Sequence, residues 1–211
     1  MSILLPFGPQ HPVLPEPIQL RLEVADEQVV SALPVVGYVH RGLEKLAEQK
    51  DFQQDAYLIE RICGICSFIH STTYCMGIEE MMSIQVPERA RYLRVVWSEL
   101  HRIHSHLLAI GLLADAFGFE NLFMQFWKTR EHIMDAMEYT TGGRVMLGSC
   151  CIGGVRKDIN EEQRKFVEEQ LDQSEKELKS LFRALLNDYS VKQRTVGVGV
   201  IDGATAYRCG A

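Results

Sequence analysis

The chain has 211 residues and a formal net charge of −6, with 46% hydrophobic and 24% charged residues. This balance is ordinary for a soluble globular protein, and the length is enough to form one large domain or two small ones with a buried core. The acidity argues against a nucleic-acid-binding surface, which needs a basic face, and no apolar run reaches the ~20 residues of a membrane-spanning helix.

The cysteines and the N-terminus indicate a compartment. The N-terminal stretch MSILLPFGPQHP lacks the basic start and the long apolar stretch of a signal peptide. Six cysteines in a chain of this length, without such a signal, favour a reducing compartment over a disulfide framework. The sequence therefore predicts a cytoplasmic location.

The first 36 residues differ from the rest of the chain. Gly8 and four prolines punctuate residues 8–17 and predict a loop. Residues 18–24 alternate apolar and polar with period two, which predicts a strand, and a turn at 25–28 leads to a second strand over 29–36. We predict a small antiparallel sheet in a first domain, residues 1–36.

Helical spacing dominates from residue 41 onward. Pro87 opens a long helix whose apolar positions recur at three- and four-residue steps up to residue 110. Glycines between 142 and 154 predict a bend, and Asp158 is the predicted cap of a charged helix that ends near residue 186. Further helices are predicted over 43–47, 55–62, 75–82 and 121–139. The predicted fold class is α+β, a mostly α-helical bundle with a small N-terminal antiparallel sheet, in which residues 37–211 form the helical domain.

The segment ERICGICSFIH, residues 60–70, concentrates metal-binding residue types. Cys63 and Cys66 present two thiolates on one side of a turn, which suits a soft metal. A local zinc set of Cys63, Cys66, His70 and Cys75 is one interpretation, and a redox pair is a second, although a helix rather than a strand precedes it. Buried, inert thiols are a third. The spacing leaves these alternatives open.

Histidines crowd the long helix that begins near Pro87. His101 and His104 share a face at i, i+3, while His106 does not. We interpret these side chains as core or interface histidines in preference to a two-histidine metal site. The neighbouring Cys150 and Cys151 are interpreted as buried thiols, because adjacent residues point apart in regular structure.

Five segments, taken together and in chain order, point to a known family. The chain resembles the large, catalytic subunit of nickel–iron hydrogenases, in particular the energy-converting, membrane-associated group (the Ech-like and CO-induced enzymes). That group is related to the 49-kDa subunit of respiratory complex I. The segments are GPQHP (8–12), GYVHRGLEK (37–45), ERICGICSFIHS (60–71), SELHRIHSHLL (98–108) and IGGVRKDI (152–159).

The resemblance implies a metal cofactor and its ligands. Cys63 matches a terminal nickel thiolate, and Cys66 matches a thiolate that bridges nickel and iron. His70 matches a histidine that hydrogen-bonds near the bridging sulfur. The implied cofactor is a nickel–iron centre whose iron carries diatomic ligands.

The resemblance also implies roles for residues around that centre. Glu16 matches a proton-gate glutamate, and Glu44 matches a carboxylate linked to a nearby magnesium or water site. His40 and Arg41 lie in a segment that faces the nearest iron–sulfur cluster of a partner subunit in the complex I relatives. Arg61 precedes the cysteine pair as the motif requires.

The implied reaction is reversible oxidation of dihydrogen and reduction of protons. Electrons leave through iron–sulfur clusters in a small partner subunit, because the remaining cysteines of this chain lack a cluster-binding spacing. A ferredoxin-like protein is the expected carrier. Other chains of the complex are expected to hold this subunit, as a peripheral protein, on the cytoplasmic side of the membrane.

One departure from the family limits these expectations. The family carries a second cysteine pair in a D-P-C-x-x-C element near its C-terminus, and the 211 residues contain no such pair. Cys209 matches no family ligand. We therefore expect an N-terminal portion of a longer subunit, truncated at the C-terminus and inactive by itself. The alternatives are a complex I-type quinone-reducing subunit, which Cys63 and Cys66 oppose, and a non-catalytic scaffold.

Overall fold

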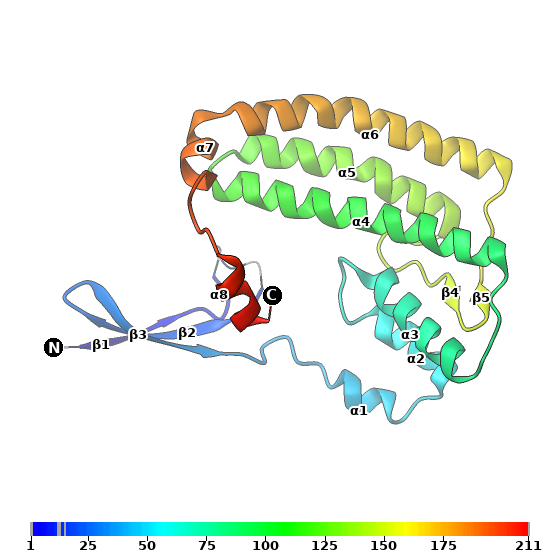
Figure 1. The fold of residues 1–211 in the computed structure, drawn as a ribbon, viewed down its shortest axis with the longest axis horizontal. Coiled ribbons are helices and arrows are strands. Elements are labelled where there is room, and N and C mark those ends of the chain that lie inside the picture. The colour runs from blue at the N-terminus through cyan, green and yellow to red at the C-terminus, as the bar shows by residue number, and fades with distance from the viewer. Residues whose placement is uncertain (1, 12–13, 15, 211) are drawn as a thin grey trace. The chain divides into compact units, whose positions relative to one another are not determined.

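The computed structural model describes residues 2–11, 14 and 16–210 and forms two compact units, Met1–Asp51 and Phe52–Ala211. The first unit contains a three-stranded sheet and one short helix, and the second contains the other helices and a two-stranded hairpin (Figure 1). The predicted α+β class with a small N-terminal antiparallel sheet is confirmed. The predicted division after residue 36 stays a prediction; the segment 37–51 lies in the first unit.

The N-terminal sheet is an antiparallel meander of β1 (Ile3–Phe7), β2 (Gln19–Ala25) and β3 (Gln28–Val35). Asp26 and Glu27 connect β2 to β3 with φ of 49° and 63°, the left-handed conformation that two-residue hairpin loops require. The strands at 18–24 and 29–36 and their turn are therefore confirmed. Strand β1 was not predicted, because ILLPF does not alternate and contains Pro6, which is tolerated here on an edge strand. Helix α1 (Leu43–Ala47) follows the sheet.

Three long helices dominate the second unit: α4 (Glu88–Ala116), α5 (Glu120–Thr141) and α6 (Glu161–Asn187). Figure 1 shows α5 between α4 and α6, with the three axes side by side. The α4–α5 connection has only three residues, so the two helices run antiparallel as neighbours. Gly111 permits their close approach, since a Cβ at this position would lie 3.1 Å from Cδ1 of Trp127.

The core lies between α4 and α5. Leu93, Leu100 and Leu107 of the predicted apolar stripe are buried, and they pack in one cluster with Phe126 and Ile133 of α5. The stripe is only partly confirmed, since its alternate positions Val96, Ile103 and Ile110 are exposed or half-buried. The long helix from Pro87 and the helix at 121–139 are confirmed.

The N-cap of the charged helix α6 lies two residues after the predicted cap. Asn160 is the N-cap: its side chain accepts from the N–H of Gln163, whose side chain accepts from the N–H of Asn160. The prediction of Asp158 as the cap is wrong, because Asp158 instead pairs with Arg89 at 2.7 Å. Two short helices that were not predicted, α7 (Tyr189–Thr195) and α8 (Gly203–Cys209), follow α6.

The glycine-rich bend contains a short hairpin, β4 (Cys150–Cys151) with β5 (Gly154–Val155). A buried ion pair fixes it: Arg94 of α4 binds the carboxylate of Glu79 at 2.5 Å and donates to the carbonyls of Cys151 and Gly154 at 2.9 Å. Glu79 also accepts from the N–H of Gly153 at 2.7 Å. One ion pair therefore ties α3 (Ser67–Met81) and α4 to the hairpin.

Candidate metal centre

The cysteine segment forms the connection between α2 (Phe52–Glu60) and α3. Cys66 is the N-cap of α3, and His70 follows four residues later, so both lie on one face of the first turn. The Sγ of Cys66 and the Nε2 of His70 are 3.3 Å apart. The ligand atoms of Cys63, Cys66 and His70 all lie within 4.8 Å of one another, and all three residues are half-buried. The structure thus brings together the three residues that the sequence analysis grouped.

The segment 143–148 holds this connection from two sides. Before the cysteines, the carboxylate of Glu60, only 1% exposed, accepts from the N–H of Gly148 at 2.9 Å. After them, the hydroxyl of Ser67 donates to the carbonyl of Val145 at 2.6 Å. Within the connection, the N–H of Ile65 lies 3.3 Å from the Sγ of Cys63. The thiols are therefore held by the fold rather than carried on a loose loop.

The two thiols influence each other. Burial, followed by the adjacent Cys63 thiol, raises the pKa of Cys66 to about 11. Near neutral pH the Cys66 thiol therefore stays protonated in the absence of a cation. A bound metal ion reverses this preference, because coordinating thiols are deprotonated.

Cys75 is not part of the group, and the four-ligand zinc set is wrong in this respect. Cys75 follows Cys66 by nine residues, about two and a half helical turns, and so faces the opposite side of α3. It is fully buried, and its thiol interacts with that of Cys150, which confirms the burial predicted for Cys150. Cys151 is half-buried. Within the described part of the chain, the possible metal ligands gather only at Cys63, Cys66 and His70.

The other predicted site residues divide between the units. Glu16 is exposed in a bend of the first unit, and Glu44 is exposed in the first turn of α1, where a carboxylate complements the helix dipole. His40 and Arg41 are exposed in the same unit. Arg61 is exposed beside the cysteines and donates to the carbonyl of Tyr57 at 2.7 Å. The predicted roles of these residues stay predictions.

The histidines of α4 approach the cysteine connection from the core side. His101 and His104 are 1% and 0% exposed, which confirms their interpretation as core histidines, whereas His106 is exposed. The backbone of Ile65 lies against both buried rings. Sequence spacing predicted their shared face but gave no sign of this contact, nor of the roles of Glu60 and Ser67.

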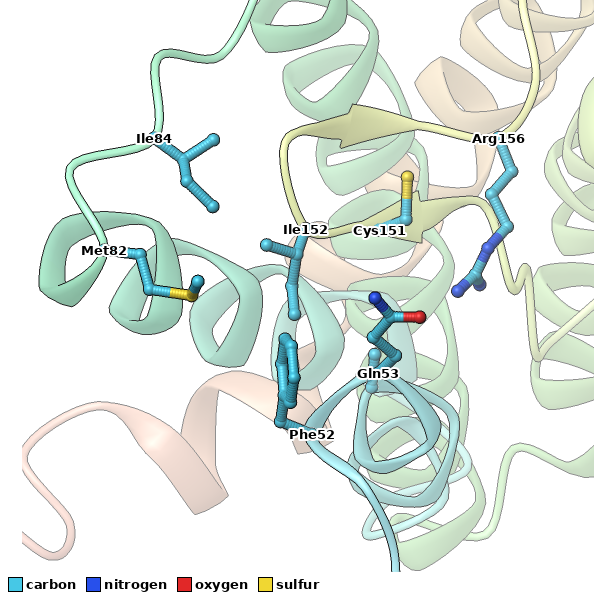
Figure 2. Close-up of a pocket in the computed structure, with 8 residues that line it drawn as sticks. Phe52, Gln53, Met82, Ile84, Cys151, Ile152 and Arg156 are labelled. Atoms are coloured by element: carbon cyan, nitrogen blue, oxygen red, sulfur yellow. The ribbon is translucent and has the colours of Figure 1, made fainter.

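A separate cavity of about 410 Å³ lies near the hairpin (Figure 2). Figure 2 shows Ile152 pointing toward Phe52, with Cys151 and Arg156 further along the lining. The Arg156 guanidinium stacks on Tyr57, 3.9 Å from the ring centroid, and donates to the carbonyl of Gly148. None of Cys63, Cys66 and His70 lines this cavity. The cavity is therefore distinct from the group formed by these three residues.

Comparisons of sequence place the chain among known oxidoreductase subunits. Residues 41–114 match the family described as nickel-dependent hydrogenase, and residues 116–211 match that described as respiratory-chain NADH dehydrogenase, 49 Kd subunit. The chain is 38% identical over 209 residues to the membrane-bound hydrogenase subunit alpha of Pyrococcus furiosus, covering 99% of this chain and 49% of that protein. It is 41% identical over 200 residues to formate hydrogenlyase subunit 5 of Escherichia coli, covering 94% and 35%. The chain thus spans about half the length, or less, of these relatives.

Comparison of structures agrees. A chain in the structure titled as the membrane-bound sulfane sulfur reductase, an archaeal respiratory membrane complex, superposes with a TM-score of 0.89 at 30% identity, covering 97% of this chain and 55% of that one. In the part of our chain that the structure describes, no helix has the length and apolar character to span a bilayer. Successive parts of the chain therefore match the nickel-dependent hydrogenases and the 49-kDa subunits of respiratory NADH dehydrogenase, and the chain is similar to both over nearly all of its length.

Proposed function

We propose that this chain supplies one half of the ligand set of a nickel–iron centre in a hydrogenase-type oxidoreductase, which interconverts dihydrogen with protons and electrons. One observation carries the proposal. The ligand atoms of Cys63, Cys66 and His70 lie within 4.8 Å of one another, in a connection that the fold holds at both ends. Soft thiolates in this arrangement suit nickel and iron.

The donor set fits an open half-site better than a closed zinc site. A structural zinc site has four protein ligands. Within the described residues this cluster offers three, and the His70 ring nitrogen already lies within hydrogen-bonding distance of the Cys66 sulfur. Cys63 would act as a terminal nickel thiolate and Cys66 as the thiolate shared with iron. His70, at 3.3 Å, would hydrogen-bond to the Cys66 sulfur. A second thiolate pair would come from outside these 211 residues.

A bound nickel–iron centre would supply the heterolytic cleavage of dihydrogen, and the chain would manage the proton. We assign Glu16 as the carboxylate that relays the proton to water, because it matches the proton-gate glutamate of the hydrogenases and a carboxylate can accept and release a proton. Glu44 would anchor a magnesium ion or water. His40, Arg41 and Arg61 would line the approach to the nearest electron-transfer cluster.

The proposal implies partners. Electrons would pass to iron–sulfur clusters of a small subunit and then to a ferredoxin-like carrier. Relatives named as membrane-bound hydrogenase and as part of a respiratory membrane complex support a peripheral position, held at the cytoplasmic side of a membrane by other chains.

A second candidate is a subunit of a complex I-type quinone oxidoreductase. The match of residues 116–211 to the NADH dehydrogenase 49-kDa family favours it. In that case the cysteine cluster would hold no nickel, and the complex would bind quinone analogues.

Nickel analysis of the complex isolated from its native source through a tag on this chain tests the proposal. We expect about one nickel per copy of the chain, lost in Cys66→Ser while the complex stays assembled. A nickel-free complex that binds a quinone analogue would support the second candidate. A nickel-free complex with a reversible Cys63–Cys66 disulfide would support thiol redox chemistry instead.

A further inference from the structure

Arg130 of α5 is a buried cation without a counter-ion among the described residues. The residue is only 9% exposed, and no described carboxylate forms an ion pair with it. Its Nη2 donates to the Nε2 of the buried His104, and its Nε has no acceptor in the part of the chain that the structure describes. Unpaired buried groups of this kind are rare in folded proteins and need an explanation.

Two other arginines of the same unit show the usual arrangement. Arg94 is equally buried and binds the carboxylate of Glu79 at 2.5 Å. Arg144 binds three carboxylates of α5, one of which is that of Glu131, the residue next to Arg130. The carboxylate nearest to Arg130 in the sequence is therefore already paired with another cation.

The neighbours of Arg130 solvate its guanidinium but do not neutralise its charge. Burial, followed by the charge of Arg130, lowers the pKa of His104 to about 3, so at neutral pH this ring accepts a hydrogen bond without carrying a charge. The Trp127 ring makes a cation–π contact, with its centroid 5.2 Å from the guanidinium carbon. Burial is also the largest influence on the pKa of Arg130, which is lowered, the direction expected for a cation without a paired anion. An uncompensated buried charge costs more than such contacts return.

The surface beside Arg130 has the composition of an interface. Trp127 is 37% exposed, and Met124, one turn earlier on the same face of α5, is 57% exposed. The ring of Phe123 lies 5.1 Å from that of Trp127 and extends the apolar surface. Tryptophan and arginine are the residue types that most often dominate the binding energy of interfaces. A segment that packs on Trp127 would come within reach of the guanidinium.

We propose that Arg130 binds the carboxylate of an Asp or Glu on a segment that packs on Trp127, and that this segment corresponds to the part of the relatives that these 211 residues do not match. Charge complementarity requires an anion, and a carboxylate matches the donor geometry of a guanidinium. The chain covers only 49% and 55% of two relatives, so each contains nearly as much chain again. Because Arg130 is already buried here, an occupant that dissociates would leave the charge bare, and a permanent segment of one polypeptide avoids this cost. The inference does not depend on the metal.

Thermal unfolding of the purified 211-residue chain tests whether the charge is uncompensated. Arg130→Lys keeps a buried charge and Arg130→Met removes it, so the methionine variant should melt at least about 2 °C above the lysine variant. The matched control is Arg144, which already has its carboxylates: there Arg144→Lys should melt above Arg144→Met. If Arg130→Lys also melts above Arg130→Met, the charge is compensated within these residues and the proposal is wrong.

The order of the two variants should reverse in the complex isolated from its native source through a tag on this chain. There the carboxylate is present, so Arg130→Lys should retain part of the ion pair, whereas Arg130→Met leaves a buried carboxylate without its cation. The complex with Arg130→Met should therefore melt at least about 2 °C below the complex with Arg130→Lys. The same order as in the chain alone would overturn the proposal. This comparison also decides the matter if neither variant folds alone.

Cross-linking identifies the occupant. A water-soluble carbodiimide joins an amine to a carboxylate in contact with it, so treatment of the Arg130→Lys complex, followed by peptide mass spectrometry, should yield an amide bond from position 130 to one Asp or Glu. Arg130→Met has no amine at this position and is the control. We expect the carboxylate on a segment outside these 211 residues that corresponds to the unmatched part of the relatives. A cross-link to a carboxylate of these residues, or to a different subunit, would overturn the proposal. A nickel-free complex that gives the expected cross-link would refute the proposed function alone.

Discussion

The ion pair between Glu79 and Arg94 offers a direct test of how the second unit is held together. Both side chains are buried, the carboxylate is bound through both oxygens, and the pair carries three backbone groups of the β4–β5 hairpin. Glu79→Gln changes almost no volume but leaves the guanidinium charge without its counter-ion. Breaking a buried pair in this way costs about 3–5 kcal/mol.

That cost is a large part of the ~5–15 kcal/mol by which domains are stable. For a chain of this size 1 kcal/mol shifts the melting temperature by about 2–4 °C, so Glu79→Gln should lower it by about 6–20 °C. Glu175→Gln, which breaks the exposed pair with Lys179, is the control and should leave the melting temperature unchanged. Calorimetry or urea unfolding measures both. A shift below about 2 °C for Glu79→Gln would refute our account of the hairpin.

The Glu79–Arg94 pair also predicts how the free energy of unfolding changes as the pH falls. Burial, the largest influence, raises the pKa of Glu79, but the hydrogen bonds from Arg94 and the Gly153 N–H outweigh it and lower the pKa overall. A carboxyl group with a lowered pKa in the folded state adds stability above its unfolded-state pKa, and this stability is lost as pH falls through the folded-state value. The unfolding free energy of the parent should therefore fall in acid more steeply than that of Glu79→Gln.

Three further predictions follow from the caps and the cluster. Asn160→Ala should cost about 0.5–2 kcal/mol in urea unfolding because it removes the capping box, whereas Asp158→Ala should leave the start of α6 intact; the reverse order would restore Asp158 as the cap. Cys66→Ser should abolish Cd²⁺ charge-transfer absorption, while Cys75→Ser should retain it, and equal loss in both would return Cys75 to the ligand set. In the complete complex, Glu16→Gln should keep its metals but slow H/D exchange at least about 100-fold; unchanged exchange would place the proton gate elsewhere.

Local signals in the sequence predicted most of the secondary structure. Period-two alternation gave β2 and β3, and three- and four-residue spacing gave the long helices α4 and α5. The errors also have local causes. Strand β1, an edge strand with a proline, shows no alternation of apolar and polar residues. Asp158 and Asn160 are both good capping residues and lie two positions apart. Only the non-local contact of Asp158 with Arg89 decides between them.

The grouping of the possible metal ligands could be predicted from the sequence, but the hydrogen bonds that hold their segment in place could not. Cys63, Cys66 and His70 are neighbours in sequence, so their spacing and the resemblance to a known family both single them out. The groups that hold them come from residues about 40 to 90 positions away: the Gly148 N–H on Glu60 and the Val145 carbonyl shared by Ser67 and His101. No periodicity or motif encodes such pairings, because they depend on how α4 and the segment after α5 pack.

The same contacts indicate from which side the cluster can be completed. On its inner side the connection is closed by buried His101 and by the segment around Val145. On its outer side Ile62, Gly64 and Ile69 are exposed, and the two isoleucines are 42% and 40% accessible. Exposed apolar groups beside half-buried thiols are typical of a surface that another segment covers. We therefore expect any second pair of thiolates to approach from this outer side, where it would bury the isoleucines and reach Cys63 and Cys66 without disturbing the helices behind them.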